Sequence, residues 1–137
     1  MLLSSAPIAE AQVVGPRGTT ATGRRAVFTN PEGGTTAVGG GQVTGVKDCT
    51  VQGIGGVKTS GQGSASYGGA ASSNGDDCTN VDVTTTGTAS YQDGQYSGSN
   101  TTTVNGKTYS TTTQDGSTTV TNPEGESETY TRNRLFR

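Results

Sequence analysis

Apolar and polar side chains alternate along the C-terminal part of the chain, between Val81 and Arg132. Val81, Val83 and Tyr91 stand at positions of one parity, and most of the residues between them are Thr, Ser or Asp. A period of two is typical of β-strands, because successive side chains of a strand point to opposite faces. The pattern is thin in bulky residues, but it predicts strands at residues 81–91, 96–104, 107–114, 117–122 and 126–132.

Turn signals separate these predicted strands at nearly even intervals. Asp93-Gly94, Asn105-Gly106 and Asp115-Gly116 are two-residue signals, and Asn122-Pro123-Glu124-Gly125 is a longer one. Tight hairpin turns need positive φ angles, which Gly adopts freely and Asn and Asp adopt more readily than most residues. Short strands joined by such turns pair with their neighbours in sequence, so the region is predicted to be an antiparallel meander.

Two further turn signals precede residue 38. One contains Pro16 and Gly18, and the other contains Asn30, Pro31 and Gly33. In each, Pro sets φ for the first corner of a type I turn, and Gly takes the left-handed position that closes a bulged hairpin. The predicted strands of this part of the chain are short: 19–22, 24–29, 42–46, 49–51 and 56–58.

The two cysteines, Cys49 and Cys78, lie on either side of most of a segment that differs in composition from the rest of the chain. Residues 59–80 are rich in Gly and Ser, which is typical of a flexible loop. A bridge between the cysteines would close this region and constrain the unfolded chain by about 3.5 kcal/mol. We therefore predict a disulfide, which is typical of an extracellular or cell-surface protein; two free thiols in a cytosolic protein are the alternative.

The composition offers few residues for a core. Thr, Gly and Ser account for 62 of the 137 residues, whereas Leu, Ile, Val and Phe total 19. Such a scarcity favours disorder, but disordered chains usually also carry a high net charge, and here it is only −2. Thr and Val favour strands. The expected fold is all-β, with antiparallel hairpins or a meander in a small sandwich or open sheet and a Gly/Ser-rich disulfide-closed loop; a largely disordered chain is the alternative.

The chain divides into four predicted regions. Residues 1–11 are interpreted as the remnant of an export signal, because Ala9-Glu10-Ala11 has the small-x-small form of a cleavage site; an ordinary N-terminus is the alternative. Residues 12–58 form an N-terminal β-hairpin region, 59–80 the flexible loop, and 81–137 a Thr-rich meander. Its strands carry too few bulky side chains to be stable alone, so the meander is expected to pack against the N-terminal strands or another copy of the chain.

The sequence provides no candidate catalytic residue, cofactor site or metal site. It contains no His, which excludes Ser-His-Asp and Cys-His catalysis. Asp76, Asp77 and Asp82 do not have the spacing of an EF-hand loop, and Gly106-Lys107 lacks the preceding Gly of a phosphate-binding loop. There is no basic patch for nucleic acid and no apolar run long enough to span a membrane as a helix. The sequence predicts a protein that is not an enzyme.

The C-terminal strand has an ordered charge pattern. Alternate residues of one face run from acidic to basic: Glu126, Glu128, Tyr130, Arg132, Arg134 and Phe136. Antiparallel pairing of two copies would place opposite charges side by side, which indicates an assembly strand. A solvated edge strand, whose charges discourage aggregation, is the alternative.

Two functional hypotheses follow. The first is a secreted structural protein, the subunit of an extracellular fibre, pilus-like filament or biofilm matrix, which polymerises by β-strand pairing between copies. The second is a monomeric surface-binding module of adhesin or ice-binding type, whose ligand, a surface or a glycan, the sequence does not specify. Pairs such as Thr84/Thr86, Thr101/Thr103 and Thr111/Thr113 resemble in composition the surface of Thr-rich ice-binding proteins.

Overall fold

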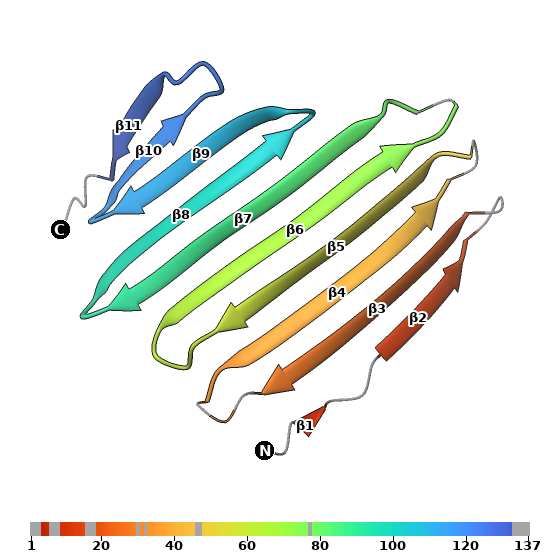
Figure 1. Cartoon of the computed structure of the whole chain (residues 1–137), viewed down its shortest axis with the longest axis horizontal. Helices are drawn as coiled ribbons and strands as arrows, with labels where there is room; N and C mark the ends of the chain where they lie inside the picture. Colours follow the sequence, from red (N-terminus) through yellow and green to blue (C-terminus); the bar gives the residue numbers. More distant parts are fainter. Residues whose placement is uncertain are drawn as a thin grey trace.

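The computed structural model of the chain is a single antiparallel β-sheet (Figure 1). It describes residues 4–5, 9–15, 19–29, 31, 33–45, 48–76 and 78–132. These residues form eleven strands and no helix. From β3 to β11 each strand pairs with the next one in sequence, while β1 and β2 both pair with β3. The all-β class is confirmed, and the sheet is open.

The C-terminal strands begin and end within one residue of the predicted positions. They are β7 (Val81–Gln92), β8 (Gln95–Val104), β9 (Lys107–Gln114), β10 (Ser117–Thr121) and β11 (Ser127–Thr131). The turns between β7 and β10 have positive φ at both residues, for example 48° at Asn105 and 80° at Gly106. These backbone angles are the ones that Asn-Gly and Asp-Gly pairs favour, so the register of each hairpin follows from its turn.

The N-terminal strands β3 (Thr20–Thr29), β4 (Thr35–Thr44) and β5 (Thr50–Thr59) are longer than predicted. Two more strands, β1 (Ser4–Ser5) and β2 (Ala9–Val14), precede the first predicted strand. The predicted fragments 19–22 and 24–29 merge into β3, across Gly23. Glycines hide the alternation of side chains, but they do not interrupt the main-chain hydrogen bonds, which each of these central strands makes on both sides.

The prediction of a flexible loop at 59–80 is wrong for most of that segment, which contains β6 (Ser64–Asn74). This strand pairs with β5 along ten positions and with β7 along another ten. A Gly/Ser-rich segment has little side-chain preference for a strand. The segment is nevertheless a strand, because each of its two neighbouring strands supplies a continuous row of hydrogen-bonding partners.

The longer turns use Gly at the left-handed position. Gly33 and Gly125 have φ of 83° and 86°. At the C-terminal turn the Asn122 side-chain oxygen accepts hydrogen bonds from the backbone N–H groups of Glu124 and Glu126, at 3.1 and 2.8 Å. Pro31 precedes β4 and is exposed. The predicted turn residues Pro16, Gly18 and Asn30 lie outside the described residues.

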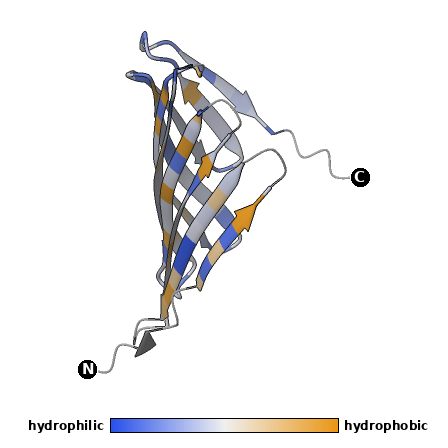
Figure 2. Ribbon diagram, turned by 90° about the vertical axis from the view of Figure 1, so that its right-hand side faces the viewer, coloured by the Kyte–Doolittle hydropathy of each residue, from blue (hydrophilic) through white to orange (hydrophobic). Residues whose placement is uncertain are grey.

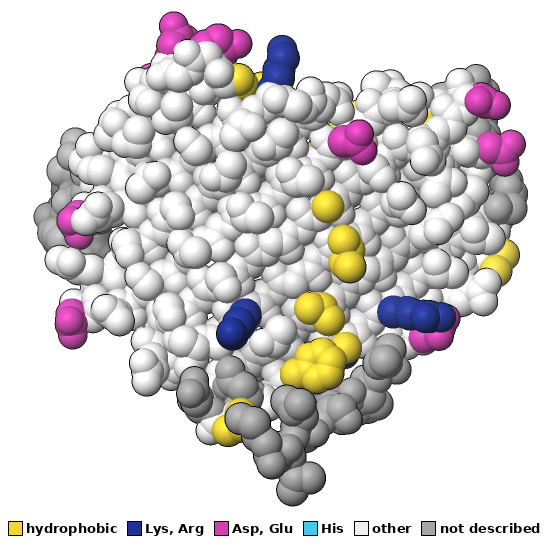
Figure 3. Space-filling model, in the orientation of Figure 1, with side chains coloured by type: hydrophobic (Ala, Val, Ile, Leu, Met, Phe, Trp, Pro, Cys, Tyr) yellow, Lys and Arg dark blue, Asp and Glu magenta, His cyan; other side chains and the backbone are white. Residues whose placement is uncertain are grey.

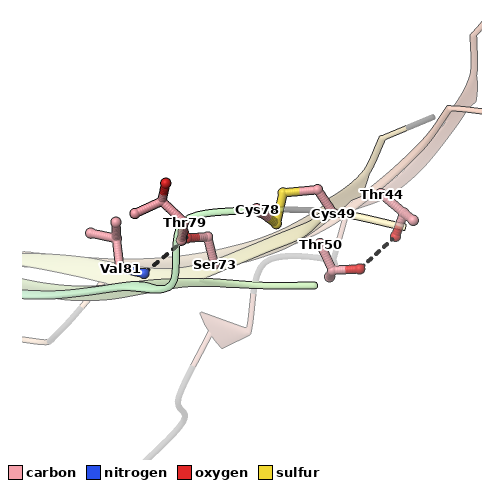
Figure 4. The surroundings of a disulfide bond; sticks show 7 residues. All are labelled: Thr44, Cys49, Thr50, Ser73, Cys78, Thr79 and Val81. Atoms are coloured by element: carbon pink, nitrogen blue, oxygen red, sulfur yellow. Dashed lines mark hydrogen bonds between the residues drawn. A yellow bond between two sulfur atoms is a disulfide. The ribbon is translucent and has the colours of Figure 1, made fainter. Parts of the chain in front are cut away.

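A disulfide joins Cys49 and Cys78, as predicted, with a Cα–Cα distance of 5.5 Å (Figure 4). Cys49 immediately precedes β5 and Cys78 lies between β6 and β7, so the bridge ties two connections at one end of the sheet. Nearby, the hydroxyls of Thr44 and Thr50 lie 3.3 Å apart. The bridge therefore holds together the β4–β5 and β6–β7 connections, neither of which is a two-residue Asn-Gly or Asp-Gly turn.

All the described strands belong to one sheet, so the fold is a single layer; Figure 2 shows that this layer is twisted and curved. Among the described residues the only buried hydrophobic side chain is Ala26, at 9% exposure, whereas Ile54 is 68% and Val13 62% exposed. The accessible surface is 10176 Å², compared with roughly 6,600 Å² for a compact monomer of this 13.7 kDa mass. The chain thus exposes about half as much surface again as a globular protein.

Candidate functional site

The pairing register assigns each strand residue to one of two faces, because paired residues and alternate residues point to the same side. All five tyrosines of the chain lie on one face, which we call the tyrosine face: Tyr67, Tyr91, Tyr96, Tyr109 and Tyr130. Nine of the eleven described valines lie there too. Most of the Tyr and Val side chains therefore lie on one side of a sheet that has no second layer, whereas Phe28, Val38 and Ile54 lie on the other side.

The opposite face, the hydroxyl face, is lined by Ser and Thr. Over β7–β11 it carries seventeen of them, interrupted by Asp82 and, at strand ends, by Gln92, Gln95 and Gln114. Figure 3 looks onto this face, where hydrophobic side chains form one short stripe and charges are few. The Thr84/Thr86 and Thr101/Thr103 pairs lie on it, whereas Thr111/Thr113 lies on the tyrosine face.

Hydroxyl groups pair across neighbouring strands. Ser90 and Ser97 lie 2.7 Å apart, and Thr119 and Thr129 lie 2.8 Å apart. Each hydroxyl can donate one hydrogen bond and accept two, so a paired hydroxyl keeps capacity for a ligand or water. The pairing fixes side-chain orientation, and the alternate residues of a strand recur about 6.8 Å apart on strands about 4.8 Å apart.

A hollow of about 950 Å³ lies on the hydroxyl face over the N-terminal strands. Gly40, Ile54 and Ala70 form its apolar floor, and at its rim Arg24 makes a 3.0 Å ion pair with Glu10. Both of these side chains are exposed, so the pair contributes little to stability. The rest of the rim is polar, with Gln42, Gln52, Ser72 and Asp82.

The candidate metal ligands do not converge. The described residues contain no group of three His, Cys, Asp or Glu side chains that would hold a metal ion. Asp82 lies on the hydroxyl face, Asp76 is exposed in the connection after β6, and Asp77 is outside the described residues. The described residues also include no helix of the length and hydropathy needed to cross a membrane.

The proposed assembly strand corresponds to β11, at the edge of the sheet. Glu128 and Tyr130 point to the tyrosine face, and a hydrogen bond with Glu128 raises the pKa of Tyr130 above its ordinary value of 10.0. Glu126 lies in the preceding turn, Arg132 directly follows the strand, and Arg134 and Phe136 are outside the described residues. The structure thus places Glu128 and Tyr130 on one face of β11, with Glu126 and Arg132 just outside the two ends of the strand.

The free edge of β11 presents backbone groups of alternate residues. The N–H of Arg132 donates to the Gly116 carbonyl at 2.9 Å, and the N–H of Asn122 donates to the Glu126 carbonyl at 2.9 Å. The backbone N–H and C=O groups of the even-numbered residues of β11 therefore bond inward to β10. The backbone groups of Ser127, Thr129 and Thr131 point outward. None of the described strands covers this edge.

The opposite edge of the sheet is built in the same way. The N–H of Gly15 donates to Thr19 at 2.9 Å, so odd-numbered residues of β2 bond inward to β3. The backbone groups of Glu10, Gln12 and Val14 consequently point outward. The described part of the sheet therefore ends in an open strand on each side.

No protein-family model, curated protein or solved structure matches this chain.

Sequence reasoning located the strands of the meander but missed how sharply the two faces differ. The signal was present in the two-residue turns. A turn such as Asp93-Gly94 pairs the residue before it with the residue after it, so the face of each residue on one strand fixes the face of its partner on the next. Applied through β7–β10, this rule places Tyr91, Tyr96 and Tyr109 on one face. The glycine-rich strands offered no such guide.

Proposed function

We propose that this chain is a structural subunit that self-associates into an extracellular fibre, pilus-like filament or matrix. The observation that carries the proposal is the single-layer sheet, which has one buried hydrophobic side chain among the described residues and a surface of 10176 Å². Burial of apolar surface is the main favourable term in folding and association. A chain that buries so little by itself gains that term by associating with copies of itself.

The two free edges supply a route for growth. Neighbouring strands alternate in direction from β2 to β11, so these two strands run in opposite directions. A second copy in the same orientation, displaced across the strands by the width of the sheet, presents its β2 antiparallel to β11. Such a head-to-tail contact does not close on itself and generates a filament. The disulfide is consistent with an extracellular protein.

The test is a proline at the outward position of the edge strand. Thr129→Pro removes an N–H that points away from β10 and leaves the inward hydrogen bonds in place. Thr129→Val is the matched control, since it keeps the N–H and the β-branched shape. We expect filaments in electron micrographs of the wild type and Thr129→Val, and none from Thr129→Pro with an unchanged β-sheet circular dichroism spectrum. Normal filaments from Thr129→Pro would contradict edge pairing.

The hydroxyl face supports a second candidate, a monomeric surface-binding module. Seventeen Ser and Thr side chains in regular rows form an extended array of hydrogen-bonding groups, with the polar-rimmed hollow beside it. A module of this kind elutes as a monomer and adsorbs to ice or to a polysaccharide. Thr101→Arg on the hydroxyl face should abolish adsorption, whereas Thr102→Arg on the other face should not. Equal adsorption of both variants would exclude this role.

A further inference from the structure

A shallow trough crosses the tyrosine face where β4, β5 and β6 lie side by side. Two adjacent rows of this face carry almost no side chains, since Gly39 pairs with Gly55, which pairs with Gly69, and Gly41 pairs with Gly53, which pairs with Ala71. We call these six residues the glycine trough. Two rows on three strands span about 14 Å in each direction, which is wide enough for a tyrosine ring.

The middle of the trough is open. A Cβ atom at Gly55 would have only backbone atoms near it, the closest being the Gly68 carbonyl oxygen at 3.4 Å, and at Gly69 the nearest atoms are likewise backbone. At the edge of the trough the Cβ atom of Arg25 lies 3.5 Å from the position that a Cβ atom would take at Gly39. Elsewhere on the same face aromatic rings do cover glycines, because the Tyr67 ring lies over Gly87 and the Tyr96 hydroxyl lies near Gly98. Tyrosine side chains thus pack over glycines elsewhere on this face, whereas the glycines of the trough have no aromatic ring of the described residues over them.

The tyrosines lie toward the other half of the same face. Tyr91, Tyr96 and Tyr109 are 60%, 51% and 42% exposed. Tyr109 is in the same row as the trough, since Gly39, Gly55 and Gly69 continue through Thr85 and Thr102 to Tyr109. Projecting rings and a row of glycines therefore occur at one level of the sheet, five strands apart.

We propose that the tyrosine face packs against the tyrosine face of a second copy, with Tyr109 of each copy seated over the glycine trough of the other. This inference rests on the proposed self-association. A twofold axis parallel to the strands, midway between β6 and β7, keeps every row in place and exchanges β9 with β4. It brings Tyr109 of one copy above Gly39 of the other, and the contact is the same in both directions.

The size and charge of the face fit a second copy. A sheet of about ten strands with ten residues each covers on the order of 1,600 Å², and a stable interface needs about 800 Å² from each partner. On β4–β8 no charged side chain points to the tyrosine face; the charges of this face within the described strands are Arg25, Lys107 and Glu128, on β3, β9 and β11. An uncharged centre is typical of interface cores, and it offers nothing to attract a charged partner. Stacking leaves both edges free for filament growth.

A matched pair of glycine substitutions tests the stacking. Gly55→Val fills the trough, whereas Gly68→Val places the same side chain on the hydroxyl face of the neighbouring strand, where the closest atom is also 3.4 Å away. Both are made in full-length Thr129→Pro protein, so that edge pairing is blocked and only face-to-face association is measured by analytical ultracentrifugation. We expect Thr129→Pro and its Gly68→Val derivative to dimerise equally, and Gly55→Val to weaken the dimer by about tenfold or more.

The outcomes separate this inference from the proposed function. A monomeric Thr129→Pro protein, or equal dimerisation with Gly55→Val and Gly68→Val, would overturn the stacking and leave edge pairing intact. A wild-type protein that stays monomeric at every concentration would overturn both.

A fluorescent probe gives an independent test, because the chain contains no Trp. In the same Thr129→Pro protein, Tyr109→Trp reports on the proposed interface and Ser110→Trp on the opposite face. As protein concentration rises, the emission of Tyr109→Trp should shift to shorter wavelength while that of Ser110→Trp stays constant. Equal behaviour of the two probes would show that Tyr109 does not enter the interface.

Discussion

The two halves of this sheet reach the same structure by different means. In β7–β11 the first three turns are two-residue Asp-Gly and Asn-Gly pairs, and the strands are rich in Thr, whose hydroxyls pair across strands. In β3–β6 glycines occupy many central positions, and long rows of backbone hydrogen bonds run between the strands. The first half is specified locally and the second by its neighbours and a disulfide. A Gly-rich segment can thus become a regular strand when it is paired on both sides.

Removal of the disulfide is expected to change the relative stability of the two halves the most. Changing Cys49 and Cys78 together to Ala should destabilise the protein by about 2–4 kcal/mol, because the unfolded chain regains the freedom of the closed loop. Hydrogen exchange should accelerate more in β5 and β6, which the bridge holds, than in β9 and β10. A uniform acceleration would contradict the view that the two halves are stabilised differently.

A turn substitution should affect the C-terminal half next most strongly. Gly106 has φ of 80°, and a Cβ atom there would meet no other atom within 4 Å, so backbone strain alone opposes a side chain. Gly106→Ala should cost about 1–2 kcal/mol in urea unfolding. Asn105→Asp, which keeps a residue suited to positive φ, is the control and should leave stability nearly unchanged. An equal loss in both variants would refute the local origin of this hairpin.

Adding a side chain to a strand of the glycine-rich half should raise the stability of the protein, whereas adding one to the turn lowers it. Gly68 lies in the middle of β6, and a Cβ atom there would make ordinary contacts at 3.4 and 3.5 Å. Gly68→Thr should therefore stabilise the protein by about 0.5–1 kcal/mol, since Gly weakens a strand interior and Thr favours it. Thermal unfolding measures the gain. Destabilisation would show that this half needs its glycines for the fold as well as for the trough.

The smallest effect concerns the exposed edge strand. The hydrogen bond with Glu128 raises the pKa of Tyr130, so its phenol should ionise at higher pH than an unperturbed tyrosine with a pKa of 10.0. Whatever stability this contact contributes is present below pH 10 and is lost as the pH rises through the raised pKa. Difference absorbance of Glu128→Gln against the wild type should show one tyrosine titrating at lower pH. Superimposable curves would contradict the contact.

Much of the fold was predictable where the decisive chemistry is local. The strands from Val81 to Thr131 were predicted within one residue of their ends, because left-handed turns restrict their sequences strongly. The Cys49–Cys78 bridge was predictable because no other cysteine is present. The strand β6 and the full lengths of β3–β5 were not predictable from the sequence. A glycine gives no signal of which face it lies on or which residue it pairs with.

The candidate site followed the same division. The sequence pointed to β11 as an edge that carries Glu128 and Tyr130, and to Thr pairs along the meander. It did not reveal that the tyrosines share one face with a row of glycines from distant strands, since that relation depends on register carried across five pairings.

By itself, then, the sequence determined the all-β class, the turns and strands of the meander, and the disulfide, because positive φ angles, side-chain alternation and a single pair of cysteines act over short or unambiguous distances. Only the tertiary structure decided that the glycine-rich segments are strands, that the sheet has one layer, and that its two faces are so unlike. Those properties come from hydrogen bonds between strands, and a glycine makes such bonds only where neighbouring strands are in place to receive them.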